Sequence, residues 1–524
     1  MDPSTRSGGD LILAIDAGTQ SMRAALVDLT GSLVHLVKTP IEPYFSEHPG
    51  WAEQRPEYYW EMLCRTTTQL LAEHPVPRER LAAVALTTQR LTMVNVDRDG
   101  NPLRPAIVWL DERRADVRKV LSAPAILLAK AARVYPIIEF AVQYCRSNWI
   151  RQNQPEVWGR THKFLFLSGF LTHRLTGELK DSTGNIIGTI PFDLKRFDWA
   201  KPGALAWRLY PLERAKLPDL VRPTELLGHV TAKASAETGI PAGLPMFAAS
   251  NDKACDVIGS GCLTPDRASI SFGTTATINT QNSRYVELFP MVPPYPSAVP
   301  GEYYNEVGVV RGLWLVSWFK EEFGLRERLQ AEGSGAAPED LLEELIRDIP
   351  PGSKGLVCQP YWTPAPQQAP YAKGALLGFG AVHTRPYVYR AILEGIVYAL
   401  KEGADVTVRK TGVPITEIRA SGGGSRSDVL MQMTADIFDL PVSRAHTSET
   451  SIVGAAMDAA VGMGAYPDLR AAAGAMTRLG DRFEPIPANV EVYRGIYERV
   501  YRRTYRRLLP LYRDIQTVTG YPEL

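Results

Sequence analysis

Two stretches of the chain, one near its start and one near its middle, follow the same plan of strand, Gly-Thr turn and second strand. LILAIDAGTQSMRAALVD turns at Gly18-Thr19, and ASISFGTTATINT turns at Gly273-Thr274, about half of the 524-residue chain further on. A chain of this length is too long for a single hydrophobic core. The repeat therefore predicts two halves of similar fold that each begin with a hairpin and face each other across a cleft.

The segments around the first hairpin have the pattern of a mixed α/β fold. LILAID, RAALVDL and SLVHLVKT are aliphatic runs separated by short polar turns, which predicts three adjacent antiparallel strands. AAVALTTQ and TMVNVD are further strand candidates, and PEYYWEMLCRTTTQLLAEH has helical spacing. We place the domain boundary near residue 260, with residues 1–10 as a disordered leader, 11–260 as the N-terminal domain and 261–524 as the C-terminal domain.

The composition argues against several classes of partner. The chain is 45% hydrophobic and 22% charged, and its formal net charge of +1 removes the simplest electrostatic case for binding nucleic acid or a membrane. The arginines of ERVYRRTYRRLLPLYRD are expected on the exposed side of an amphipathic helix. Five dispersed cysteines without a CxxC pair indicate reduced thiols, and no stretch reads as a membrane span. We therefore expect a cytoplasmic protein, and a homodimer is left open.

The first Gly-Thr turn combines a carboxylate with a series of small donors. Gly18 permits a close backbone approach, and the residues after it offer N–H and side-chain donors that can cradle phosphate oxygens. Asp16, at the end of the strand, is placed to hold a magnesium ion through water. An ordinary hairpin with a solvated Asp16 fits the same residues, so both interpretations stay open at this point. The candidate phosphate-binding residues of this turn are Thr19, Gln20, Ser21 and Arg23.

A glycine-rich turn lies between a strand and a helix in EIRASGGGSRSDVLMQMTADIF. Three glycines at such a junction leave room for a flat ring or a phosphate against bare backbone, and Ser427 or Ser425 is expected to cap the helix that follows. The pattern is neither G-x-G-x-x-G nor a GxxxxGK[ST] loop, which disfavours a dinucleotide or P-loop site. A tight strand–helix turn without a ligand is the structural alternative.

A single carboxylate stands out at the proposed domain boundary, in ASNDKACDVIGSGC. Asp252 there is a candidate base that accepts a hydroxyl proton while the oxygen attacks phosphorus, and Lys253 could favour its ionised form. A surface or helix-capping role is the alternative for Asp252. The small residues of ETSIVGAAMDAAVGMGAY indicate instead a helix that packs very closely against its neighbours.

Taken together and in order, these motifs resemble the FGGY family of carbohydrate kinases, within the actin/hexokinase/Hsp70 fold superfamily. The resemblance runs from about residue 11 to 467 and includes DAGTQSMRA, QRLTMVNVDRDGNPLRPAIVWLDERRA, SNDKACDVIGSG, SFGTTATIN, SGGGSRSDVLMQMTADIFDLPV and ETSIVGAAMDAA. It implies an α/β protein of two RNase H-like (actin-like ATPase) domains flanking a catalytic cleft. It further implies that ATP is held mostly by the C-terminal half and the sugar mostly by the N-terminal half.

The resemblance also implies a role for each matching residue. Asp252 becomes the catalytic base and Asp16 the carboxylate on the magnesium side, with ATP and Mg²⁺ as cofactors. The residues named for the first turn match phosphate contacts of the family. Gly273 and Thr274 match such contacts in the second turn. The remaining nucleotide contacts implied are Gly312, in VVRGLWLVSWF, with Gly423, Gly424 and Ser427. The implied substrate contacts are Gln89, Arg90, Trp109, Asp252 and Lys253.

The expected activity is transfer of the ATP γ-phosphoryl group to a hydroxyl of a small sugar or polyol. Leu91 stands where glycerol kinase has an acidic residue, Lys253 replaces its glutamine, and QRLT replaces the Met-His-Gly triplet of typical xylulokinases. These departures favour a different pentulose, polyol or related sugar. The alternatives are a catalytically weakened kinase homologue and an ATP-dependent binding or chaperone-like module of the same superfamily.

Overall fold

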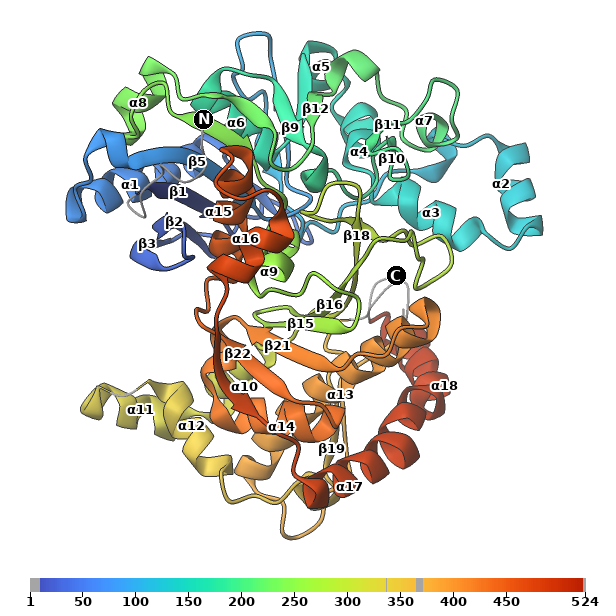
Figure 1. Cartoon of the computed structure of the whole chain (residues 1–524). Helices are drawn as coiled ribbons and strands as arrows, with labels where there is room; N and C mark the ends of the chain where they lie inside the picture. The colour runs from blue at the N-terminus through green and yellow to red at the C-terminus, as the bar shows by residue number, and fades with distance from the viewer. Residues whose placement is uncertain (1–9, 336, 364–370, 522–524) are drawn as a thin grey trace.

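Two β-sheets form the centres of the two halves of the molecule, one above the other in Figure 1. The structure, a computed structural model, describes residues 10–335, 337–363 and 371–521, so nearly all of the predicted leader lies outside the described residues. The N-terminal sheet has six strands in the order β13-β14-β5-β1-β2-β3. Their bounds are β13 Leu226–His229, β14 Pro245–Ala248, β5 Leu81–Thr88, β1 Leu11–Ala17, β2 Ser21–Asp28 and β3 Leu33–Pro40.

The second sheet, in the C-terminal half, has seven strands in the order β17-β18-β16-β15-β21-β22-β23. Its first two full strands, β15 and β16, are antiparallel, and β15 pairs in parallel with β21 on its other side. The strand bounds are β17 Tyr295–Pro296, β18 Tyr303–Val309, β16 Ala276–Asn282, β15 Arg267–Phe272, β21 Glu417–Ser421, β22 Val442–Ala445 and β23 Leu479–Phe483.

The two sheets repeat one plan of pairing. In each, a first strand pairs antiparallel with the strand that follows the Gly-Thr turn, and that strand pairs antiparallel with a third strand, β3 or β18. On its other side the first strand pairs in parallel with a strand much later in its half, β5 or β21. The three antiparallel strands and the paired hairpins predicted from the sequence are therefore confirmed. The strand predicted in TMVNVD also forms, as β6 (Met93–Val96), but it belongs to a separate four-stranded sheet, β4-β7-β6-β8.

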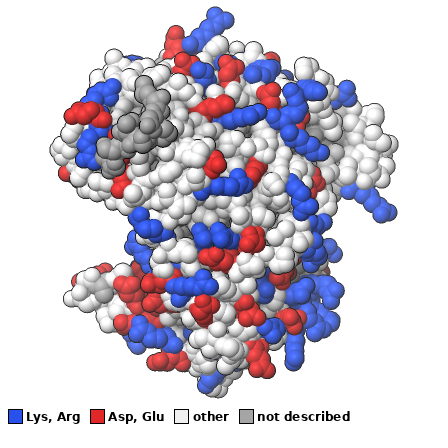
Figure 2. Space-filling view, in the orientation of Figure 1, with Lys and Arg blue, Asp and Glu red and all other residues white. Residues whose placement is uncertain are grey.

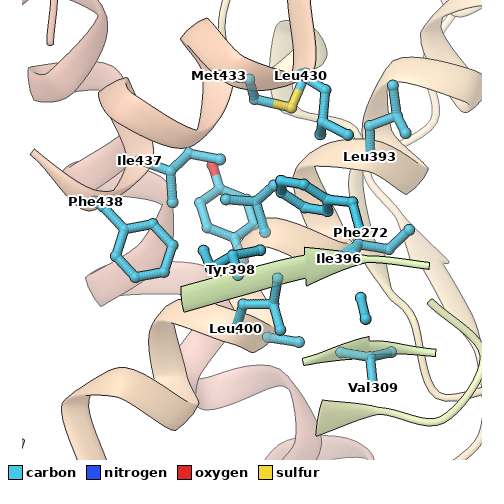
Figure 3. Packing of buried hydrophobic residues seen from close by; sticks show 14 of the residues in the cluster. Phe272, Val309, Leu393, Ile396, Tyr398, Leu400, Leu430, Met433, Ile437 and Phe438 are labelled. Carbon is cyan, nitrogen blue, oxygen red and sulfur yellow. The ribbon is translucent and has the colours of Figure 1, made fainter. Parts of the chain in front are cut away.

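Amphipathic helices cover the faces of both sheets. The predicted first helix is α1 (Pro56–Glu73), which begins at a proline and buries Tyr59, Leu63 and Leu70 at helical spacing beneath the N-terminal sheet. In the other half the long helix α13 (Arg385–Thr411) and α14 (Asp428–Phe438) pack on the second sheet, and Figure 3 shows their side chains around Phe272 and Val309. The further helices used below are α9 Asp252–Gly259, α10 Trp314–Phe323, α12 Pro338–Ile346, α15 Thr450–Gly462, α16 Leu469–Met476, α17 Pro487–Ile496 and α18 Arg502–Thr519.

One segment from late in the chain packs on the N-terminal sheet. Helices α15 and α16 share a buried cluster with β1, β2 and β5, and Figure 1 shows these red helices beside the blue strands. The close packing predicted for α15 is confirmed at its crossing with α9. A Cβ added to Gly454 would lie 2.0 Å from the carbonyl oxygen of Cys255, and one added to Gly259 would lie 1.9 Å from that of Thr450. Glycine at both positions lets the two helix backbones meet.

The C-terminal helices have the amphipathic character that the sequence predicts. Tyr493, Tyr497 and Tyr501 are buried, whereas the arginines of this region are exposed, and Figure 2 shows basic side chains gathered along the edge formed by α18. Within the described part of the chain, none of the helices combines the length and apolarity needed to span a bilayer. The division into domains at residue 260 stays a prediction, because α15 and α16 belong to the later half in sequence and to the earlier half in packing.

Candidate active site

A large cleft runs between the two halves and is lined by both Gly-Thr turns. Its volume is about 2630 Å³, against roughly 300–1,000 Å³ for the pocket of one small ligand, so it has room for two. Most of the residues singled out in the sequence lie along it. Those that line the cleft are Asp16, Thr19, Gln20, Arg23, Gln89, Arg90, Trp109, Asp252, Lys253, Gly273, Thr274, Gly423, Gly424 and Ser427.

The first turn is closed by its own backbone. The N–H of Gly18 donates to the carbonyl oxygen of Ser21 (3.1 Å), and a Cβ on Gly18 would lie 3.2 Å from the same oxygen. The hydroxyl of Thr19 is fixed from the side of the N-terminal half, because it donates to Gln89 Oε1 (3.0 Å) and accepts from Trp109 Nε1 (3.0 Å). The turn is therefore held in one shape before any ligand binds.

Asp16 lies at the end of β1 and is almost completely buried. Its Oδ2 accepts hydrogen bonds from Arg23 Nη1 (2.9 Å) and from the hydroxyl of Ser451 (2.8 Å). Its Oδ1 is buried and has no hydrogen-bond partner among the described residues. A buried oxygen without a partner is costly unless a ligand supplies one, and a hard carboxylate oxygen suits magnesium.

The second turn is supported by the loop before α10. The carbonyl oxygens of Gly273 and Thr274 accept from the N–H groups of Leu313 (3.0 Å) and Trp314 (3.2 Å). The glycine turn after β21 lies beside it: a Cβ on Gly424 would come within 2.9 Å of the Cβ of Phe272. The two turns therefore form one continuous wall of the cleft.

The glycine turn offers bare backbone at one position. Gly422 has φ +81° and sits against the backbone of Phe272, whereas a Cβ on Gly423 would meet nothing within 4 Å. Ser427 is the N-cap of α14 and accepts from the N–H of Leu430 (3.1 Å), as the sequence predicts. A flat ligand can therefore lie over Gly423 next to the positive end of a helix.

Asp252 is the first residue of α9. The helix is capped by Asn251, whose side-chain oxygen accepts from the N–H of Ala254 (3.1 Å) and from the hydroxyl of Tyr304 (3.1 Å), a residue of the C-terminal half. The amide nitrogen of Asn251 donates to the carbonyl oxygen of Gly184 (2.6 Å). The cap thus fixes where Asp252 points, and its side chain, 28% exposed, lines the cleft.

The surroundings of Asp252 make its carboxylate more basic than usual. Burial raises the pKa of Asp252 to about 6, against the opposing effect of the positive charges of Lys253 and Arg90. The negative charges of Asp16 and Glu306 act in the same direction as burial. A carboxylate with a pKa near 6 is ionised at neutral pH and is still a useful proton acceptor.

Arg90 is fixed beside Asp252 by residues of the C-terminal half. Its Nη2 donates to Glu306 Oε1 (2.9 Å), its Nη1 donates to the hydroxyl of Tyr304 (3.2 Å), and its guanidinium lies 5.1 Å from the ring centre of Tyr295. Its Nε is 4.0 Å from Asp252 Oδ1. Burial opposes the charge of Arg90, but Glu306 and its other neighbours hold its pKa well above the ordinary value.

Comparison with protein families decides what this cleft belongs to. The model of the FGGY family of carbohydrate kinases, N-terminal domain, matches residues 11–259, and the model of its C-terminal domain matches residues 268–463. The chain belongs to the FGGY family of carbohydrate kinases. It is thereby an ATP-dependent sugar kinase, and its two halves have the actin-like ATPase fold expected from the sequence.

Individual members of the FGGY family match nearly the whole chain. A protein of Escherichia coli (strain K12) described as an uncharacterized sugar kinase, YgcE, is 31% identical over 92% of this chain and 90% of its own length. The xylulose kinase of Lactococcus lactis subsp. lactis (strain IL1403) is 27% identical over 93% of this chain and 95% of its own. The structure of xylulose kinase from Rhodospirillum rubrum superposes with a TM-score of 0.79 at 27% identity, covering 96% of this chain and 100% of that one.

Within this FGGY kinase, two predicted nucleotide contacts do not line the cleft. Ser21 is buried in β2 and takes part in the first turn only through its backbone oxygen. Gly312 packs against β16, where an added Cβ would lie 2.2 Å from the backbone nitrogen of Ala276. The side chain of Ser21 and the Cα face of Gly312 are therefore packed against protein neighbours, and nucleotide contact by these two residues stays a prediction.

Two predicted substrate residues have their polar groups engaged elsewhere. The amide of Gln89 accepts from Thr19 and donates to the hydroxyl of Tyr59 (3.0 Å), so it supports the first turn. The ammonium group of Lys253 donates to the hydroxyl of Ser271 (3.1 Å), on β15 just before the second turn. Lys253 therefore extends toward the second Gly-Thr turn.

Several site residues escaped the sequence reasoning. Glu449 Oε2 lies 3.3 Å from Arg23 Nη1, and the hydroxyl of Ser451 donates to Asp16, although the small residues of their helix indicate only close packing. Glu306 and Tyr304 hold Arg90 from an unremarkable strand, β18. These residues reach the site only through long-range packing. The polar start Glu449-Thr450-Ser451 of an otherwise apolar helix was the one local signal available.

Proposed function

We propose that the chain transfers the γ-phosphoryl group of ATP to a hydroxyl of a small sugar or polyol, with Asp252 as general base. The observation that carries the proposal is the position of Asp252: it lies at a helix start, 4.0 Å from Arg90 Nε, in the cleft that both Gly-Thr turns line, and its pKa is about 6. The sugar would lie on the side of Arg90 and Trp109. The triphosphate would lie along the second turn and the glycine turn.

The reaction needs one proton transfer and one displacement at phosphorus. The substrate oxygen gives its proton to the carboxylate of Asp252 and forms a bond to the γ-phosphorus, while the bond from that phosphorus to the bridging oxygen breaks and ADP leaves. Arg90 stabilises the ionised carboxylate and offers N–H groups to neighbouring sugar hydroxyls. Enclosure of both ligands between the halves keeps water from taking the phosphoryl group.

Charge on the phosphates is met by groups from both halves. The N–H groups of the two turns, Arg23 and Lys253 are the donors and cations available along the cleft. Hydrogen bonds already fix Thr19 to Trp109 and Lys253 to Ser271. Donors that are held in place in this way need no rearrangement during the reaction.

Magnesium fits one position of the site. Asp16 presents a buried carboxylate oxygen that has no hydrogen-bond partner among the described residues. Because those residues contain no group of three metal-binding side chains, Asp16 would share the ion with water and phosphate oxygens. When bound, the ion would neutralise charge on the phosphate oxygens.

The acceptor class follows from the relatives and from the residues around Arg90. Relatives named xylulose kinase support a pentulose or polyol of similar size. Leu91, next to Arg90 in the chain, has φ +59°, and its side chain packs against Gly188, where an added Cβ would lie 2.4 Å from Leu91 Cδ2. An apolar side chain therefore occupies the space next to the proposed sugar.

The five cysteines are free thiols, which is consistent with the cytoplasmic location that we expect.

A screen of acceptors tests the proposal. Release of ADP is measured with pentuloses, hexuloses, polyols and deoxy sugars, and the phosphorylated product is identified by mass spectrometry. We expect stoichiometric ADP and sugar phosphate with at least one pentulose or polyol. A weakened kinase homologue or chaperone-like module would instead show sugar-independent ATP hydrolysis, or nucleotide binding without a phosphorylated product.

A further inference from the structure

In the C-terminal half, apolar side chains line the cleft beside the glycine turn: Leu313 and Leu430 reach to within 2.3 and 3.3 Å of the position of a Cβ added to Gly424. We call this part of the cleft the base slot and define it by five of its lining residues: Leu313, Leu393, Leu430, Gly423 and Glu343. Leu393 and Leu430 are 4% and 2% exposed, and Figure 3 shows both at the end of the core that contains Phe272. Apolar side chains together with bare backbone at Gly423, where an added Cβ meets nothing within 4 Å, suit a flat aromatic ring.

One wall of the base slot carries a carboxylate. Glu343, on α12, is half-buried, and its Oε1 accepts from the N–H of Val429 (3.2 Å) in the first turn of α14. The ring of Tyr389 also lines the cleft here; burial raises the pKa of its hydroxyl, and the negative charge of Glu343 raises it further. The hydrogen bond to Val429 therefore holds the carboxylate of Glu343 at the base slot.

We propose that Glu343 accepts a hydrogen bond from the exocyclic amino group of adenine and thereby sets the base preference of this kinase. The inference rests on the proposed function, which places the nucleotide along the glycine turn. An ionised carboxylate can only accept hydrogen bonds, and the amino group is the one strong donor on the adenine ring of ATP. The hydroxyl of Tyr389 can both donate and accept, so it does not discriminate in the same way.

Deleting the amino group from the ligand and the acid from the protein isolates this contact. Dissociation constants are measured for ADP and for purine riboside diphosphate, which lacks only the amino group, with the wild-type chain and with Glu343→Ala. We expect the wild type to bind ADP about tenfold more tightly, as for one charged hydrogen bond. In the Ala variant we expect the ratio to fall to about one. A purely structural loss would weaken both ligands equally and leave the ratio unchanged.

Two further variants complete the experiment. Glu344→Ala removes an exposed carboxylate of the same helix that does not line the cleft, and it should keep the tenfold ratio. Glu343→Gln keeps an oxygen for Val429 and so preserves the start of α14 if the Ala variant does not fold. Its ratio should lie between those of the wild type and the Ala variant.

The outcomes separate the inference from the function on which it rests. Equal ratios for the wild type and both Glu343 variants overturn the role of Glu343 while leaving nucleotide binding intact. A wild-type chain that binds neither diphosphate overturns the proposed function and the inference together.

Discussion

At the scale of the residue, the chemistry of Asp252 depends on neighbours from both halves of the chain. Asn251 fixes its position, Tyr304 fixes Asn251, and Arg90 and Lys253 partly offset the effect of burial on its pKa. A carboxylate at the start of a helix would otherwise be held ionised and weakly basic by the helix dipole. Burial opposes that effect, and the pKa near 6 follows.

The pH dependence of the reaction should report this carboxylate. Because the general base must be ionised, kcat/KM should fall about tenfold per pH unit below pH 6 and level off above it. Lys253 lowers the pKa of Asp252, so Lys253→Met should move the acid limb to higher pH, by about one unit. The measurement is a pH profile of kcat/KM for both proteins. A profile flat down to pH 4.5, or a limb that moves to lower pH in the variant, would contradict the assignment.

Residue types and order were enough to predict most of the cleft but not the partners of its side chains. Asp16 and Asp252 could be selected because each ends or begins an element next to small polar residues. Gln89 and Lys253 are predicted substrate contacts, yet hydrogen bonds to Thr19 and Ser271 direct their polar groups to the two Gly-Thr turns. Such pairings depend on which strands lie side by side, which one sequence does not state.

At the scale of the element, the crossing of α9 and α15 links Asp252, the proposed base, to the rest of the fold. Asp252 begins α9, and the far part of that helix meets α15 at Gly259 and Gly454. The small residues of α15 predicted close packing, and the structure confirms it. The small residues could not predict that the packing partner would be the helix that begins at Asp252. Residue types show that a helix is buried, but they do not show which element it packs against.

A methyl group at this crossing should be strongly destabilising. Gly454→Ala places a Cβ 2.0 Å from the carbonyl oxygen of Cys255, a backbone atom that cannot move away alone. We expect the free energy of unfolding to fall by about 3 kcal/mol. The matched control is Gly474→Ala on α16, where an added Cβ meets nothing within 4 Å and stability should rise by roughly 0.5–1 kcal/mol. Urea unfolding monitored by circular dichroism measures both, and equal midpoints for the two variants would show that the crossing tolerates the methyl group.

At the scale of the whole molecule, the two halves are not independent segments of chain. The repeated hairpins predicted two similar sheets, and these are confirmed. The sequence order alone, however, assigned everything after residue 260 to the second half. That boundary stays a prediction. In the structure α15 and α16 pack on β1, β2 and β5, so the chain passes between the two halves more than once.

A fragment ending at the predicted boundary should therefore be incomplete. Residues 11–260 alone would expose the sheet face that α15 and α16 cover, and large exposed apolar faces lead to association. We expect this fragment to bind a hydrophobic dye and to aggregate, and the same fragment joined by a flexible linker to residues 446–478 to be monomeric. Size-exclusion chromatography with light scattering distinguishes them. A monomeric, cooperatively unfolding fragment without the added helices would contradict the packing described here.

In the proposed mechanism ATP and the acceptor alcohol lie on either side of Asp252, and one comparison tests this arrangement most directly. Sugar-dependent ADP release is measured for the wild type and Asp252→Asn with the best acceptor, together with the dissociation constant of ADP for each. We predict that kcat of the variant falls by about 10³-fold, as expected for loss of a general base, while its affinity for ADP changes less than about twofold. Turnover by Asp252→Asn at the rate of the wild type would contradict the assignment of Asp252 as the base.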